Sequence, residues 1–70
     1  MKIVRVKFEN YYRVYSYKTN LSLRPGAKYK ITADGQEYGT PVRIIGYTEQ
    51  APFGIELKEI CGAEEVEENG

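Results

Sequence analysis

Histidine and tryptophan are absent from this 70-residue chain, and cysteine occurs once, at Cys61. Without histidine, the chain lacks the usual general base near neutral pH and the commonest metal ligand in proteins. A single cysteine forms neither an intrachain disulfide nor a thiolate cluster for a metal. These absences predict a protein that is not an enzyme and that holds no metal and no other cofactor.

Long apolar runs are also lacking, and no stretch approaches the length of a membrane span. Charges at Lys2 and Arg5 interrupt the opening residues, where a signal peptide needs a continuous apolar segment. The lone cysteine suits a reducing compartment. We therefore expect a cytoplasmic protein that does not associate with membranes.

Short alternating segments are present instead, and they predict five strands near residues 2–8, 12–18, 28–33, 37–47 and 55–60. Pro25-Gly26 suits a type II turn, and Asp34-Gly35 is the strongest hairpin signal. Gly39 and Pro41 interrupt the fourth segment and indicate a bend or bulge. No segment carries an apolar stripe of helical period. We predict an all-β domain over residues 1–60, a small five-stranded antiparallel barrel of the SH3-like or OB-like kind, because closure removes exposed strand edges.

Charge is divided unevenly along the chain, although the net charge is zero. All ten lysines and arginines lie within residues 1–58, beside five acids, whereas residues 59–70 hold five acids and no base. Residues 61–70 contain too little apolar surface to pack, which predicts a disordered acidic tail. This tail could compete for a basic surface of the same chain, dock on a basic protein, or simply increase solubility.

The order of several motifs resembles one small barrel type. These motifs are a Tyr-x-Tyr strand at residues 13–19, Leu21-Ser22-Leu23, the Pro25-Gly26 turn, Tyr29-Lys30-Ile31, and Gly39 before Val42-Arg43-Ile44. Over residues 2–47 the chain is similar to the N-terminal DNA-binding domain of the primosomal replication-restart helicase, and to short phage and prophage proteins. The resemblance implies a DNA-contacting barrel and an accessory role in a phage or mobile element.

Basic residues on the polar sides of the predicted strands are candidates for contacting phosphate, and nearby tyrosines are candidates for stacking on bases. The orientation of the tyrosine pair at 15 and 17 is open, because both could fill the core or, together with Tyr11, line the outer face. The candidate nucleic-acid-binding residues are Arg5, Lys7, Arg13, Tyr15, Tyr17, Lys28, Lys30 and Arg43.

Two alternatives remain beside nucleic-acid binding. One is a protein-interaction module that modulates a host or phage protein through an exposed apolar patch around Ile3, Ile45 and Phe53, or through an open strand edge. The other, which the lack of histidine disfavours, is a subunit of a metabolic enzyme whose site is shared between chains. The pattern does not indicate an oligomeric state.

Overall fold

The structure is a computed structural model that describes residues 1–51, 54 and 56–67. It contains six strands and, within these described residues, no helix. The strands are β1 (Lys2–Phe8), β2 (Val14–Thr19), β3 (Lys28–Ala33), β4 (Gln36–Glu37), β5 (Val42–Thr48) and β6 (Glu59–Glu65). The prediction of an all-β chain is therefore confirmed.

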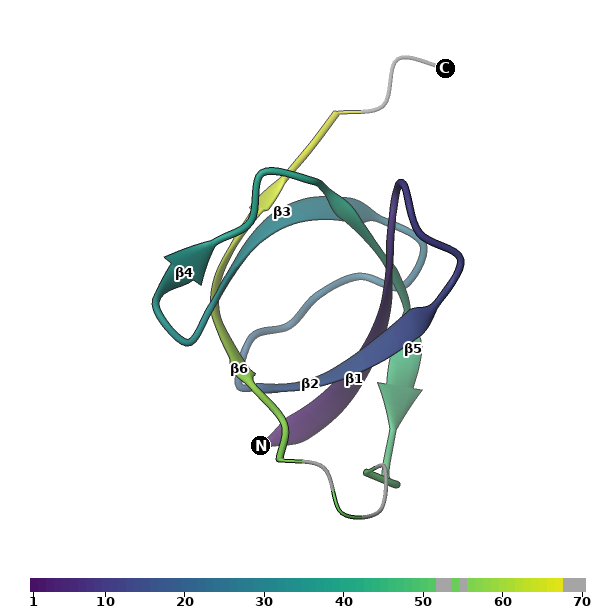
Figure 1. The fold of residues 1–70 in the computed structure, drawn as a ribbon, viewed down its shortest axis with the longest axis vertical. Helices are drawn as coiled ribbons and strands as arrows, with labels where there is room; N and C mark the ends of the chain where they lie inside the picture. The colour runs from purple at the N-terminus through teal and green to yellow at the C-terminus, as the bar shows by residue number, and fades with distance from the viewer. Residues whose placement is uncertain (52–53, 55, 68–70) are drawn as a thin grey trace.

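Five of the strands form a closed barrel, and the two-residue β4 pairs antiparallel with the end of β3 (Figure 1). β1 lies between β2 and β5, and β3 joins β5 to β6. β2 and β6 close the ring through a short parallel pairing, Lys18 with Glu59 and Thr19 with Ile60. The predicted five-stranded barrel is confirmed, with this one difference from a purely antiparallel arrangement.

Alternation along the strands separates the core from the outer face. In β1, Val4 and Val6 are fully buried while Arg5 between them is exposed. In β5, Val42 and Ile44 are buried while Arg43 is exposed. Because neighbouring side chains of a strand point to opposite faces, the inward set fills the barrel and the outward set is left for other roles. The buried apolar residues are Val4, Val6, Tyr17, Leu23, Tyr29, Ile31, Ala33, Val42, Ile44 and Ile60.

A β-bulge in β5 changes the facing of its last residues. Opposite β1, Arg5 pairs with Gly46 whereas Val6 pairs with Ile44, so Ile45 is the extra residue. Beyond the bulge Tyr47 pairs with Val4, and its hydroxyl accepts a hydrogen bond from the Leu23 amide at 2.7 Å. The bulge thus leaves Ile45 exposed and anchors the end of β5 to the segment between β2 and β3.

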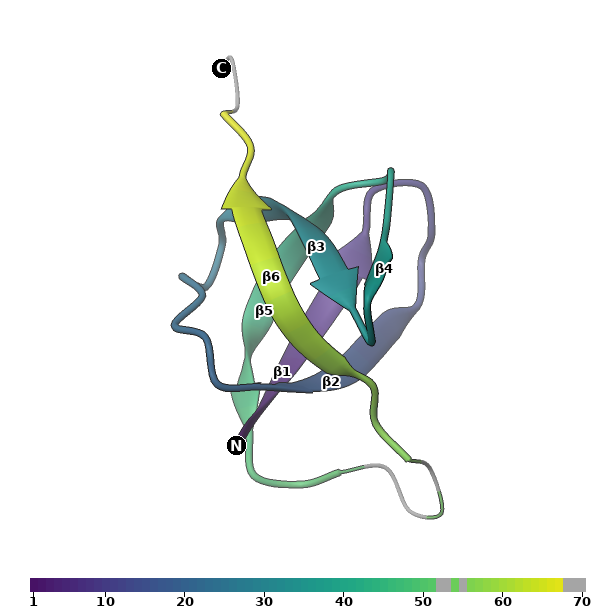
Figure 2. The ribbon, with the colours of Figure 1, turned by 90° about the vertical axis from the view of Figure 1, so that its left-hand side faces the viewer.

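The last strand differs from its predicted position. We expected a strand at 55–60 and a disordered tail at 61–70, but β6 spans Glu59–Glu65 and pairs with β3 from Ala33 to Tyr29. The tail prediction is wrong for residues 61–65, because backbone hydrogen bonds to β3 order a strand with only one large buried side chain, Ile60. Figure 2 shows β6 running beside β3 across the front of the barrel. Ile55 lies outside the described residues.

Two polar contacts hold β6 at its ends. At its start, the buried Thr19 side chain donates a hydrogen bond to the Ile60 carbonyl (2.9 Å) and accepts one from the Leu21 amide (3.0 Å). At its end, Arg24 forms an ion pair with Glu65 at 2.7 Å. The acidic segment is therefore partly built into the barrel. Within the described residues, the structure offers no helix long and apolar enough to cross a membrane.

Candidate nucleic-acid interface

Three basic side chains form a row across neighbouring strands on the outer face. Lys7 of β1 pairs with Arg43 of β5, and Arg43 pairs in turn with Lys28 of β3. Adjacent strands lie roughly 5 Å apart, so the three backbone positions are direct neighbours. We call Lys7, Arg43 and Lys28 the basic row. It exists because each of the three residues alternates with buried apolar neighbours on its own strand.

Two further arginines extend the basic row. Arg5 lies two residues before Lys7 on the same face of β1, between Gly46 and Ser16 of the adjacent strands. Arg13 is exposed in the β1–β2 loop, directly before the residue that pairs with Lys7. Four of the predicted phosphate-binding residues thus lie at neighbouring positions of the outer face, with Arg13 in the adjoining loop. We call these five residues the basic face: Arg5, Lys7, Arg13, Lys28 and Arg43.

Polar contacts with neighbouring residues hold two side chains of the basic row in place. Lys28 donates a hydrogen bond to the Glu9 carboxylate at 2.8 Å, and its side chain is only 18 % exposed. This hydrogen bond and the Lys28 charge lower the pKa of Glu9. Arg43 donates to the Gly26 carbonyl at 2.6 Å. Glu9 therefore offsets part of the positive charge that the row presents.

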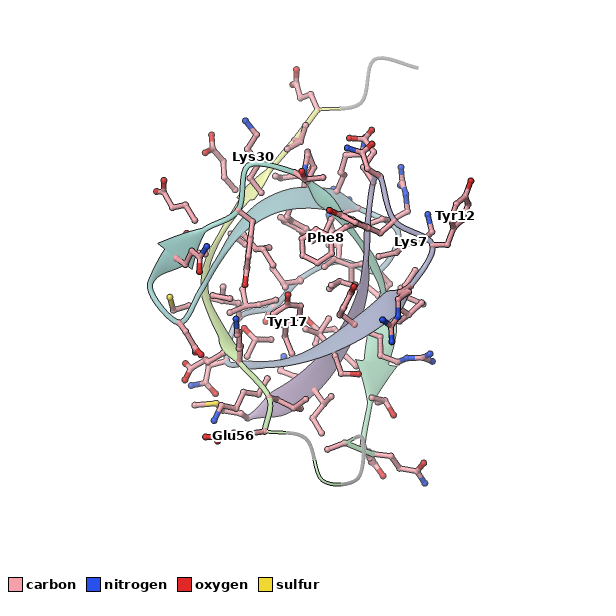
Figure 3. All side chains as sticks on the ribbon, viewed as in Figure 1. Lys7, Phe8, Tyr12, Tyr17, Lys30 and Glu56 are labelled. Carbon is pink, nitrogen blue, oxygen red and sulfur yellow. The ribbon has the colours of Figure 1, made fainter. Side chains whose placement is uncertain are left out.

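The sixth predicted cation, Lys30, lies away from the basic face. Its cross-strand partner is Glu64 of β6, so an acid stands beside it. Figure 3 shows Lys30 and Lys7 on different sides of the barrel. The structure therefore separates Lys30 from the other candidates. The charge division along the sequence becomes a division in space, with cations over β1 and β5 and acids along β6.

The two tyrosines of β2 share one side of the strand but differ in depth. Tyr17 is buried in the core at 7 % exposure, and burial, reinforced by Tyr38, raises its pKa. Figure 3 shows it pointing into the barrel. Tyr15 lies nearer the barrel mouth and is 37 % exposed. The core interpretation holds for Tyr17, which is inaccessible to a base, whereas Tyr15 remains available to a ligand.

An aromatic cluster surrounds Tyr15 at this mouth of the barrel. Phe8 lies at its centre and makes edge-to-face contacts with Tyr11, Tyr15 and Tyr38, with ring centroids 6.2, 5.6 and 5.7 Å away. These four rings, with Gly39 and Thr40, line a pocket of about 250 Å³ that we call the aromatic pocket. Sequence reasoning singled out neither Phe8 nor Tyr38, because only barrel closure brings residues 8, 15 and 38 together.

A second aromatic feature, Tyr12, lies on the outer side of the β1–β2 loop. Its side chain is 97 % exposed, and the Lys7 ammonium lies 5.8 Å from the ring centroid. This distance is typical of a cation–π contact. Sequence reasoning placed Tyr12 in a strand, whereas the structure places it in the loop, exposed beside the basic row and outside the aromatic pocket.

The residues predicted for protein binding are only partly assembled. Ile45 is 46 % exposed at the bulge, whereas Ile3 is half-buried. Arg5 lies on the same outer face, so charge interrupts the expected apolar patch. Phe53 lies outside the described residues. Across the part of the chain that the structure describes, no group of three or more acidic, cysteine or histidine side chains is placed to hold a metal ion.

Comparisons of the chain with protein-family models, with curated proteins and with solved structures found no match. The function is therefore inferred from the chain's own residues and their geometry.

Proposed function

We propose that this chain is a small binding module that contacts nucleic acid through the basic face. The observation that carries the proposal is the basic row, in which β1, β5 and β3 place Lys7, Arg43 and Lys28 side by side. A rigid barrel holds these backbone positions before a ligand arrives, so binding does not require the face to be assembled. Pre-organisation of this kind lowers the entropy cost of association.

Phosphate is the ligand group that suits this face best. Lysine and arginine bind phosphate oxygens, and each neutralised phosphate releases counterions, which makes binding strongly dependent on salt. Acids that would repel a polyanion are gathered along β6, where Glu64 stands beside Lys30 and Glu65 pairs with Arg24. A nucleic acid would therefore be oriented over β1 and β5.

The resemblance to a DNA-binding barrel domain supports the same function. It favours an accessory role in replication or regulation of a phage or mobile element. The Tyr-x-Tyr strand that carries the resemblance borders the aromatic pocket through Tyr15. The proposal therefore places nucleic acid at the end of the barrel where the basic face and the aromatic side chains meet.

The experiment is a fluorescence anisotropy titration of labelled 20-mers, single-stranded and duplex, between about 25 and 200 mM salt. Arg5→Thr/Lys7→Thr removes two charges from the basic face. Lys30→Thr/Lys58→Thr is the matched control, because it removes two exposed charges elsewhere. With log Kd plotted against log salt, the first variant lowers the slope by roughly 1.4–1.8 and the control leaves it almost unchanged. The proposal is wrong if the wild type does not bind at micromolar concentration in low salt, or if both variants lose affinity equally.

A protein-interaction module is the second candidate, and exposure of Ile45 at the bulge favours it. In that case Ile45→Lys abolishes capture of a defined partner from host lysate without weakening oligonucleotide binding. An unchanged set of captured proteins counts against this alternative. The two functions are separable because Ile45→Lys adds charge beside the basic face and would, if anything, strengthen contact with a polyanion.

A further inference from the structure

The barrel has two adjoining hollows at the end where β1 meets the β1–β2 loop. One is on the outer face and is lined by Lys7, Phe8, Glu9, Lys28 and Arg43. The other is the aromatic pocket at the barrel mouth, which also contains Phe8. The shared residue is the last of β1, and the hydrogen bond from the Glu9 amide to the Pro41 carbonyl (3.1 Å) marks the rim between the hollows. A ligand that crosses this rim would meet cations on one side and aromatic rings on the other.

The β1–β2 loop places its two tyrosines on opposite sides of the rim. Tyr11 contacts Phe8 and lines the aromatic pocket, whereas Tyr12 lies beside Lys7 on the outer side. Figure 3 shows Phe8 directed into the barrel and Tyr12 outside it with Lys7. The β1–β2 loop makes this possible, because the chain turns there, with the Tyr11 amide bonded to the Phe8 carbonyl, and consecutive residues face different ways. Aromatic and cationic groups therefore lie within a few residues of each other.

We infer that the aromatic pocket takes an unpaired base of a single-stranded nucleic acid whose phosphates lie on the basic row. This inference rests on the proposed function and adds the substrate class. A single strand carries an anionic group and a flat aromatic group in every nucleotide, so it matches cations next to an aromatic pocket. The pocket's volume of about 250 Å³ admits one base. Stacking on aromatic side chains tolerates any base, because every base presents a π-face.

A duplex can contact the basic row but cannot place a paired base in the aromatic pocket. Its phosphates could reach the basic row, but its bases are stacked and paired, and entry into the pocket would require unstacking at a cost of a few kcal/mol. The pocket also lies at a barrel mouth between the β1–β2 loop and residues 38–40. The inference therefore covers an unpaired base at an internal or a terminal position.

The experiment compares three ligands of known chemistry by fluorescence anisotropy at one low salt concentration. They are a 12-residue oligothymidylate, an abasic 12-mer with the same sugar–phosphate backbone, and a 12-base-pair duplex. The wild type binds the oligothymidylate roughly 5- to 150-fold more tightly than the abasic strand, which is the contribution of one stacked base. A circular oligothymidylate binds as well as a linear one of equal length.

Two matched variants locate the base. Tyr11→Ser removes a ring from the aromatic pocket, so it brings the affinity for oligothymidylate towards that for the abasic strand and leaves duplex binding unchanged. Tyr12→Ser removes the neighbouring ring outside the pocket, and the preference for bases over the abasic backbone persists. Both side chains are exposed, and thermal melting verifies that both variants are folded.

The outcomes separate this inference from the proposed function. If the three ligands bind alike and Tyr11→Ser changes nothing, the base pocket is wrong while nucleic-acid binding stands. If only the linear strand binds and the circular one does not, the site requires a strand end, and the inference that any unpaired base fits the pocket is overturned. If none of the ligands binds at micromolar protein, both proposals fail.

Discussion

Replacing Thr19 with valine tests how the barrel is closed between β2 and β6. The Thr19 hydroxyl is fully buried, donates to the Ile60 carbonyl and accepts from the Leu21 amide. Valine keeps the shape but loses both hydrogen bonds, and it leaves a partly buried amide without its acceptor. The bond to the carbonyl contributes about 1 kcal/mol, and an unsatisfied amide costs about 1–3 kcal/mol, so the free energy of unfolding falls by about 2–4 kcal/mol.

The assay is urea denaturation followed by circular dichroism. A 70-residue domain has roughly 4–10 kcal/mol of total stability, so this loss is a large fraction of it. With an m-value of about 1 kcal/mol/M, the urea midpoint moves down by roughly 2 M or more. Thr19→Ser is the control, because it keeps both hydrogen bonds and loses only a methyl group, about 1 kcal/mol. If the valine variant is as stable as the serine variant, the hydroxyl does not close the barrel.

Three further predictions concern charge and packing. Glu9→Gln removes the negative charge beside Lys28, so oligonucleotide affinity in low salt rises, by up to about fivefold; an unchanged affinity would mean that Lys28 does not contact the ligand. Hydrogen-bonded ion pairs with Lys28 and Arg24 hold the pKa values of Glu9 and Glu65 below their ordinary range. These ion pairs therefore stabilise the folded protein above the unfolded-state pKa of the carboxylates, and this stabilisation is lost as pH falls through the folded-state pKa. The melting temperature therefore falls on acidification, and it falls less in the Glu65→Gln variant than in the wild type. Finally, Ile60→Ala costs about 2–5 kcal/mol in urea denaturation because Ile60 is fully buried, whereas Ile45→Ala stays within about 0.5 kcal/mol.

Local patterns were sufficient to predict most of the strands. The period-two alternation of residues 2–8 and 28–33 matches β1 and β3. The turn signals also hold, since Gly26 and Gly35 have φ values of 86° and 78°, which favour glycine. The single strand predicted at 37–47, with a bend or bulge at Gly39 and Pro41, is instead two strands, β4 and β5, which are separated at these residues.

The last strand could not be predicted from its side chains. Ile60 is the one large apolar side chain of β6, and the order of the strand comes from backbone pairing with β3, which no local pattern reveals. Because the apolar residues lie within 55–60, the strand was predicted to begin before residue 59, where β6 begins. A strand that completes a barrel can be held by its neighbours' backbone groups, so weak hydrophobic patterning does not exclude it.

The sequence was sufficient to predict which side of its strand each basic residue of the site lies on. It was not sufficient to predict which strands are neighbours. Alternation placed Arg5, Lys7, Lys28, Lys30 and Arg43 on the polar sides of their strands, and all five point outwards. Only the strand order shows that Lys28 neighbours β5 while Lys30 neighbours the acidic β6. The aromatic pocket likewise depends on closure, because it combines residues from β1, β2 and two loops.

The most direct test of the central claim is a map of backbone amide chemical shifts on addition of an unlabelled single-stranded 12-mer at low salt. The account predicts shifts concentrated at Lys7, Lys28, Arg43 and the β1–β2 loop, with β6 and Lys30 almost unaffected. Shifts centred on β6, or spread evenly over the barrel, would contradict a nucleic-acid interface on β1, β5 and β3.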